Sequence, residues 1–186
     1  SHGIWHADRA LVCSGTDFET LYPEIFAASG LTRCKLQMMR TKSQPESWSL
    51  GPMLAGGLTL RHYTSFAACP SLAQLKERVA AETPQYDRYG IHVMASQNGL
   101  GEIVIGDSHE YGDAVGPFDK PEIDRLILDY LHTFLAAPSL KISQRWHGIY
   151  AQNPAGPDFV ADPATGVKVV NGVSGAGMST SFGLAQ

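Results

Sequence analysis

The stretch of the chain best suited to hold a ligand is a glycine-rich turn near its end. Residues 166–170 (Gly-Val-Lys-Val-Val) favour a strand, the turn covers residues 172–177 (Gly-Val-Ser-Gly-Ala-Gly), and residues 178–186 could begin a helix. A strand, a glycine turn and a helix start together aim backbone N–H groups at an anion. The spacing is not the GxGxxG of a dinucleotide site. An ordinary glycine turn therefore explains these residues as well as a cofactor loop does.

A second candidate is the aromatic segment at residues 145–150 (Arg-Trp-His-Gly-Ile-Tyr). Trp146, His147 and Tyr150 surround one glycine and could line an aromatic pocket. A packed strand end with one hydrogen-bonded histidine explains the same residues. The packed strand is the simpler interpretation, because Trp, Tyr and His side chains are commonly at least partly buried.

A third candidate, Arg61-His62-Tyr63, ends a segment from Trp48 onward that we predict to be extended. The guanidinium of an arginine suits a planar carboxylate or a phosphonate, so these residues could bind an anionic substrate. A solvated strand edge would carry the same residue types. The sequence leaves both interpretations open.

Metal binding and hydrolase chemistry are not indicated. The histidines lack an HExxH motif and any paired spacing, so we expect no metal site; they are His62, His92, His109 and His147. Ser174 lies among glycines but lacks the GxSxG pattern of a nucleophile elbow. The three cysteines include no CxxC pair, which favours a reducing cytoplasm.

The composition predicts a folded protein with a substantial core. Of the 186 residues, 44% are apolar and 17% are charged, which argues against disorder. The net charge is −4 and the cations are scattered, whereas a nucleic-acid partner would require a basic stripe. No run of 18 apolar residues occurs, so we expect no membrane span.

The hydrophobic pattern predicts an α+β fold in which an antiparallel sheet carries helices. A hairpin is expected from residues 91–95 to 103–105, with Asn98-Gly99 supplying the positive φ of its turn. The strongest helix is expected after Asp119, which would cap it, with Pro121 in the first turn. Further predicted elements are a helix at 23–28, a strand at 31–41, a helix at 71–84 and a strand at 140–146.

Both ends of the chain have the pattern of strands from a larger layer. Residues 7–13 form a mostly apolar run that enters a turn at Ser14-Gly15, and we interpret this run as a buried strand. Termini of an independent domain are usually exposed and frayed. We therefore expect a fragment, or one chain of a cut protein, whose first and last strands are neighbours.

Three segments resemble the D-amino-acid oxidase/glycine oxidase family of FAD enzymes. Residues 7–15 are similar to the strand that leads into the family's A-T-G turn, with Cys-Ser-Gly here. Residues 145–150, followed by 158–160, resemble the family's W-x-G-x-R…T-x-D segment, and 169–186 resemble its last strand, glycine loop and flavin-facing helix. The resemblance covers essentially the whole chain. More narrowly, the chain is similar to a bacterial subgroup associated with aminophosphonate metabolism.

The resemblance implies three parts of the chain. Residues 1–15 would be a remnant of the FAD-binding domain, 16–145 the substrate-binding domain, and 146–186 the C-terminal part of the FAD-binding α/β domain. The family's N-terminal GxGxxG unit, which carries the adenine and pyrophosphate of FAD, does not precede residue 7. A missing N-terminal segment is therefore an expected partner.

The activity implied by the resemblance is oxidation of an amine or amino acid with FAD as cofactor. A hydride would pass from the C–H next to nitrogen to flavin N5, and the imine would be hydrolysed. An alternative from a different class is a non-catalytic α+β binding module, in which the glycine loop only turns the chain.

The resemblance also assigns site residues. Lys35 and Tyr150 are the catalytic candidates. The substrate-binding candidates are Arg61, His62, Tyr63, His147 and Tyr150. The cofactor-binding candidates are Ser14, Gly15, Gly148, Gly175, Ala176, Gly177, Met178 and Ser179.

The chain departs from the family at one of these positions. The arginine that binds the substrate carboxylate in the family falls at Tyr150, and a tyrosine cannot form a bidentate ion pair. A small anionic amine, such as an aminophosphonate held by Arg61, His62 and Lys35, fits the available cations better than a simple α-amino acid.

Overall fold

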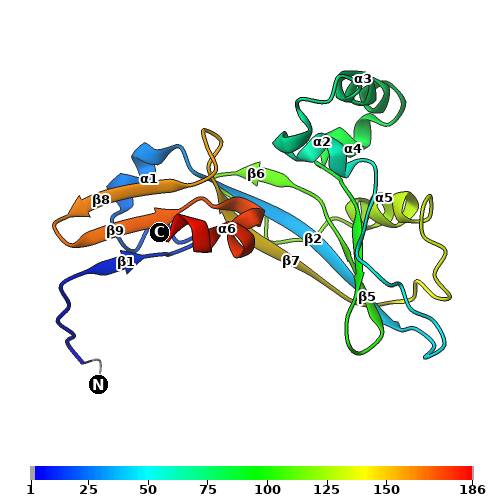
Figure 1. The fold of residues 1–186 in the computed structure, drawn as a ribbon, viewed down its shortest axis with the longest axis horizontal. Coiled ribbons are helices and arrows are strands. Elements are labelled where there is room, and N and C mark those ends of the chain that lie inside the picture. Colours follow the sequence, from blue (N-terminus) through cyan, green and yellow to red (C-terminus); the bar gives the residue numbers. More distant parts are fainter. Residues whose placement is uncertain (1–2, 186) are drawn as a thin grey trace. The chain divides into compact units, whose positions relative to one another are not determined.

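The computed structural model describes residues 3–185 and divides the chain into two compact units (Figure 1). Unit 1 contains the residues up to Cys34, Tyr111–Val115, and those from Ile149 onward. Unit 2 contains Lys35–Glu110 and Gly116–Gly148. Boundaries of these units fall inside three strands: β2 (Thr32–Ser43), β6 (Glu110–Gly112) and β7 (Ile142–Gln152).

Unit 1 contains a three-stranded sheet in the order β1-β9-β8. Its elements are β1 (Ala10–Val12), α1 (Pro23–Ser29), β8 (Phe159–Ala164), β9 (Val167–Asn171), a 3-10 turn (Ser174–Ala176) and α6 (Gly177–Leu184). Strands β1 and β9 are parallel, with Ala10 opposite Val167 and Val12 opposite Val169, and Figure 1 shows them side by side. This pairing confirms the prediction that the first and last strands are neighbours.

The core of unit 1 is small. Phe26, Leu31 and Val169 are its buried members, and Phe18 stacks on Phe26 with ring centroids 5.2 Å apart. The first strand was expected to be buried, and that expectation is wrong. Strand β1 lies at the edge of this sheet; Ala10 and Leu11 are exposed, Leu11 by 71%, and Val12 is only partly buried.

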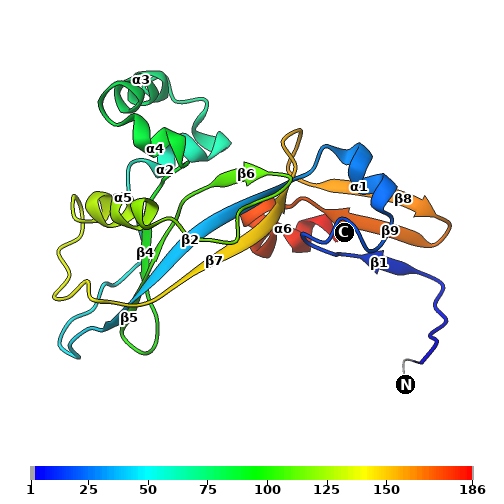
Figure 2. The same ribbon diagram turned by 180° about the vertical axis from the view of Figure 1, so that it is seen from behind.

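Unit 2 is built on an antiparallel sheet. Its strand order is β3-β4-β5-β2-β6, and β7 also pairs with β2. Its elements are β3 (Leu54–Ala55), α2 (Thr59–His62), a 3-10 turn (Thr64–Phe66), α3 (Leu72–Glu82), α4 (Pro84–Arg88), β4 (Met94–Gln97), β5 (Glu102–Gly106) and α5 (Pro121–Leu131). Figure 2 shows this unit from the opposite side. The presence of both helices and an antiparallel sheet confirms the predicted α+β class.

The predicted hairpin is present as β4 and β5, with Ala95 opposite Ile105. Its turn differs from the prediction. Gly101, with φ of 76°, supplies the left-handed residue, and Asn98 instead accepts backbone N–H groups of Leu100 and Glu102 through its side-chain oxygen. The connection has four residues, so a two-residue primed turn is not needed.

Helix α5 covers the sheet of unit 2 with one apolar face. Ile123, Ile127 and Leu131 are fully buried and pack in one cluster with sheet residues such as Ile103 and Ile105. Pro121 begins the helix, as predicted. The predicted cap is wrong: Lys120 holds the cap position without a side-chain hydrogen bond, since the carboxylate of Asp119 pairs elsewhere.

The segment from residue 48 to 63 is not extended throughout. Residues 54–55 form β3, but residues 59–62 form helix α2, so Arg61 and His62 lie at a helix end. Gly56 follows β3, and the rings of Tyr130 and Phe134 require a glycine there: a Cβ would lie 2.6 Å and 2.8 Å from their ring carbons. None of the described helices is both long and apolar enough to span a membrane.

Shortening a buried side chain of α5 tests the packing of unit 2. Because Ile127 has no exposed surface, the Ile127→Ala change should lower the free energy of unfolding by about 2–5 kcal/mol through lost transfer energy and a cavity. Urea denaturation of the full-length protein measures this. Arg125→Ala, at an exposed position of the same helix, is the control and should change the value by less than about 0.5 kcal/mol. Equal effects would contradict the packing described here.

Candidate functional site

The carboxyl ends of β1 and β9 fall at the same edge of the unit 1 sheet, because the two strands are parallel. The turn at Ser14-Gly15 follows β1 and the turn at Gly172 follows β9. Asn171 connects them: its side-chain N–H donates to the Gly15 carbonyl at 2.9 Å, and its side-chain oxygen accepts from the Gly172 N–H at 2.7 Å. The crevice beyond the carboxyl ends of parallel strands is where α/β proteins bind nucleotide cofactors.

The glycine turn after β9 combines close packing with an open surface. A Cβ on Gly177 would lie 2.6 Å from the Val173 side chain, so a glycine is needed where α6 starts. A Cβ on Gly15 or Gly175, by contrast, would meet no other described atom within 4 Å. These two positions therefore leave backbone open to a ligand.

Helix α6 presents apolar side chains to the surface of unit 1. Met178 is 90% exposed and Phe182 is 81% exposed, and none of the described residues of the helix is buried. Ser179 and Ala176 are exposed as well. An open helix start beside exposed apolar groups suits a cofactor that has both anionic and flat apolar parts. These residues therefore fit FAD.

The predicted substrate residues Arg61, His62 and Tyr63 lie together in unit 2. The guanidinium of Arg61 pairs with the carboxylate of Asp87 and is mostly buried. The His62 and Tyr63 rings meet edge to face with centroids 5.0 Å apart. Arg61 and His62, but not Tyr63, line an open cavity of about 140 Å³; its other lining residues include Leu58, Tyr86, Gly90 and Ile91.

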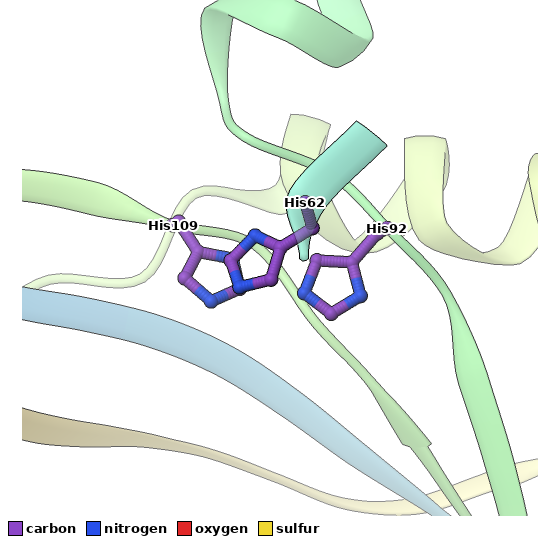
Figure 3. Close-up of side chains that lie close together, drawn as sticks. All are labelled: His62, His92 and His109. Atoms are coloured by element: carbon purple, nitrogen blue, oxygen red, sulfur yellow. The ribbon is translucent and has the colours of Figure 1, made fainter. Parts of the chain in front are cut away.

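Two histidines that sequence reasoning treated as isolated join this group. The centroid of the His62 ring lies 4.1 Å from that of His92 and 4.5 Å from that of His109. The centroids of His92 and His109 are 4.9 Å apart. Figure 3 shows the three imidazoles converging from α2, from the segment before β4 and from the segment after β5. No spacing in the sequence signals this cluster, because tertiary folding alone unites the three segments.

Burial keeps these imidazoles neutral. It lowers the pKa of His92 to about 3 and that of His109 to about 4, and it also lowers the pKa of His62. Burial raises the pKa of the nearby Asp107 carboxyl to about 7. The Asp107 Oδ1 atom lies 3.3 Å from His92 Nε2, but the geometry is not that of a hydrogen bond, and neither atom has a hydrogen-bond partner among the described residues.

Lys35 and Arg61 contact different residues of unit 2. Its buried Nζ donates to the carbonyls of Gly116 (2.8 Å) and Phe118 (2.6 Å) and lies 3.0 Å from Asp119 Oδ1. His147 Nδ1 contacts the same Asp119 oxygen at 2.7 Å. Asp119 thus brings together two predicted site residues, Lys35 and His147.

The remaining predicted site residues are divided between the two units, with Gly148 in unit 2 and with Tyr150 and Ser14 in unit 1. Gly148 is the last residue of unit 2 in β7, and a Cβ there would lie 3.3 Å from Leu36 Cδ1. Tyr150 belongs to unit 1 and is half-buried. Ser14 donates its hydroxyl hydrogen to the Asp17 carbonyl at 2.8 Å.

Comparison with known proteins defines the class to which this fold and site belong. The family described as DAO, FAD dependent oxidoreductase, matches residues 7–186. The chain therefore belongs to this family of FAD-dependent oxidoreductases, which confirms the family-level expectation. No curated protein matches the chain.

Two solved structures have a similar fold. Glycine oxidase from Bacillus cereus ATCC 14579 gives a TM-score of 0.61 at 14% identity, over 96% of this chain and 40% of that one. L-proline dehydrogenase from P. horikoshii gives a TM-score of 0.61 at 16% identity, over 91% of this chain and 38% of that one. The chain thus spans about two fifths of each structure, and at this identity the likeness concerns the fold.

The Asp119 carboxylate should stabilise unit 2 by compensating the buried Lys35 charge. Burial raises the pKa of Asp119. The hydrogen bonds from Lys35 and His147 together lower it by more, so this pKa lies below its usual value of 3.8. The Asp119→Asn change should cost about 1.5–3 kcal/mol, the range for charge-assisted hydrogen bonds, measured by urea denaturation near neutral pH. Because the folded-state pKa is depressed, this contribution is present above pH 3.8 and is lost as the pH falls below it.

The surface pair of Asp162 and Lys168, 2.8 Å apart with both side chains well exposed, provides the control. Asp162→Asn should change stability by less than about 1 kcal/mol, as exposed pairs do. If Asp119→Asn is no more destabilising than Asp162→Asn, Asp119 does not compensate a buried charge.

Proposed function

We propose that this chain, together with a further N-terminal segment, binds FAD and oxidises a small amine. The observation that carries the proposal is the parallel pairing of β1 and β9, which brings the turns at Gly15 and Gly172 to one edge of a sheet. Membership of the FAD-dependent oxidoreductase family supports it. We propose that residues 1–15 and 146–186 contribute to the FAD-binding domain and that residues 16–145 bind substrate.

The cofactor-binding residues that we propose are Ser14, Gly15, Gly148, Gly175, Ala176, Gly177, Met178 and Ser179. When bound, FAD supplies an acceptor for the hydride that leaves the carbon next to the amine nitrogen, and water hydrolyses the resulting imine. The backbone N–H groups at the start of α6 would stabilise negative charge at this place. Met178 and Phe182 would be covered and would exclude water.

The substrate that we propose is an amine that also carries an anionic group, such as an aminophosphonate. Arg61, His62 and Tyr63 would bind the anion, with His147 and Tyr150 as further contacts and Lys35 as a fixed positive charge. Arg61 already pairs with Asp87, whose side chain is 44% exposed. A phosphonate would replace this carboxylate, which can turn out into solvent. We also propose a cytoplasmic enzyme, because the described cysteines Cys13, Cys34 and Cys69 form no disulfide.

The decisive experiment is anaerobic addition of amines to the purified full-length protein. A flavoenzyme should be yellow, and its visible absorption should bleach when an amine substrate reduces it. A colourless protein that takes up no added FAD would support the alternative, a non-catalytic binding module. A yellow protein that no amine reduces would retain the cofactor assignment and reject amine oxidation.

The glycine at the start of α6 provides a test of the cofactor site. Gly177→Val places a branched side chain where even a Cβ would lie 2.6 Å from Val173, so α6 should shift and FAD should dissociate more readily. The flavin-to-protein absorbance ratio after gel filtration should fall. Gly183→Ala, where a Cβ would meet no described atom within 4 Å, should retain the wild-type ratio. If Gly177→Val also retains it, α6 does not hold the cofactor.

The role of Arg61 can be tested with a pair of substrates. Arg61→Ala should raise KM for an aminophosphonate by about 10–150-fold, the equivalent of a lost charge-assisted hydrogen bond. KM for the matching amine without the phosphonate should not change, and circular dichroism should show an intact fold. Arg78→Ala, an exposed arginine of α3, is the matched control. An unchanged KM for the aminophosphonate would remove Arg61 from the substrate site.

A further inference from the structure

The cluster of His62, His92 and His109 has features of a metal site, and of its three members the proposed oxidation uses only His62. One possible ligand atom from each residue can be chosen so that all three lie within 4.8 Å of one another. A triangle of that size has its corners about 2.8 Å from its centre, against ~2.0–2.1 Å for a zinc–nitrogen bond. Movement of each ring by less than ~1 Å would therefore bring the three nitrogens to bonding distance.

The chemical state of the rings suits a metal ion. An imidazole binds a metal through a neutral nitrogen with a free lone pair. His109 Nδ1 lies 3.1 Å from the Gly90 carbonyl, which can only accept a hydrogen bond, so Nδ1 carries the proton and Nε2 carries the lone pair. A ring that donates its other N–H to a backbone carbonyl is the usual arrangement of a metal-bound histidine.

His92 provides the second, independent observation. Its side chain is only 3% exposed, yet neither of its ring nitrogens has a hydrogen-bond partner among the described residues. Buried polar atoms without partners are rare and costly, and an absent ion is one of their recognised causes. Figure 3 shows this ring directed toward the other two.

The Asp107 carboxyl group offers a further contact for a cation. Its Oδ1 atom lies 3.3 Å from His92 Nε2 and 4.0 Å from His109 Nδ1, and this oxygen too lacks a hydrogen-bond partner in the described chain. In its ionised form this group attracts a cation, and the charge of the neighbouring Arg61 is already paired with Asp87. His62 is exposed, so the cluster is open to solvent on one side and an ion can enter.

We propose that His62, His92 and His109 bind one divalent transition-metal ion of the zinc class, with Asp107 as a fourth ligand or as a charge partner. Three imidazoles and one carboxylate are a ligand set typical of zinc and its neighbours, rather than of magnesium or calcium. The ion would join α2 to the segments that flank β4 and β5. This site departs from the sequence-based expectation that no metal binds, and it does not depend on amine oxidation.

The test is zinc binding to the full-length protein, prepared without a histidine tag and treated with a chelator. Titration calorimetry and metal analysis after dialysis should give one zinc ion per chain. His62→Gln, His92→Gln and His109→Gln should each weaken zinc binding by roughly 100-fold or more. Loss of a residue that only supports a metal ligand typically weakens binding by about 10–100-fold, so loss of a ligand should weaken it at least as much. His132→Gln, at the end of α5 and outside the cluster, is the matched control and should bind as the wild type does.

Because His92 and His109 are buried, their variants could fail to fold. The exposed His62 then decides, since His62→Gln should retain the wild-type circular dichroism. Absence of stoichiometric zinc from the wild type, or equal zinc affinity in His62→Gln and His132→Gln, would overturn the proposal. Flavin absorbance in the same samples separates the two proposals: zinc bound without flavin counts against the oxidase, and flavin retained without zinc counts against the metal site.

Discussion

The parallel pairing of β1 with β9 is the constraint on which unit 1 depends. Strand β1 has only three residues and an open edge, so its backbone hydrogen bonds to β9 hold it in place. Asn171 completes the junction: it is 5% exposed and bonds both the Gly15 carbonyl and the Gly172 N–H. Without this side chain, the Gly15 carbonyl would lose this hydrogen bond, at a cost of about 0.5–1.5 kcal/mol. The pairing therefore fixes two glycine turns at one edge of the sheet, where the carboxyl ends of parallel strands can receive a nucleotide cofactor.

The polar interior of unit 2 is organised around two groups of different chemistry. In the first, carboxylates compensate cations: Asp119 contacts Lys35 and His147, and Asp124 contacts Arg145 and accepts from the Gln37 amide. In the second, three imidazoles and one carboxylate lie close together with few hydrogen bonds. Desolvation disfavours the imidazolium form of these rings. In this second group, both ring nitrogens of His92 and the Oδ1 atom of Asp107 lack a hydrogen-bond partner among the described residues, so a ligand could satisfy them.

Family and substrate have different sources of support in this protein. The match over residues 7–186 establishes membership of the family of FAD-dependent oxidoreductases, and the two similar structures share the fold at 14% and 16% identity. One fold can carry many substrates, because specificity lies in a few side chains of the site. Tyr150 illustrates this point, since it stands where the resemblance places a carboxylate-binding arginine. The substrate that this chain binds therefore depends on its own cations. Each of Lys35, Arg40 and Arg61 already faces a carboxylate.

The sequence by itself determined the elements whose signals are local. Gly30 ends α1, Pro121 begins α5, alternation marks β4 and β5, and the glycine turn leads into α6, because turn residues and hydrophobic periodicity act within one segment. The motifs at the two ends also determined the family. Tertiary structure alone decided the helical conformation at Arg61 and His62, the diversion of Asp119 from helix cap to ion pair, and the union of His62, His92 and His109. Those outcomes depend on contacts between segments distant in the chain, whose packing and burial energies exceed local preferences and leave no periodic trace in the sequence.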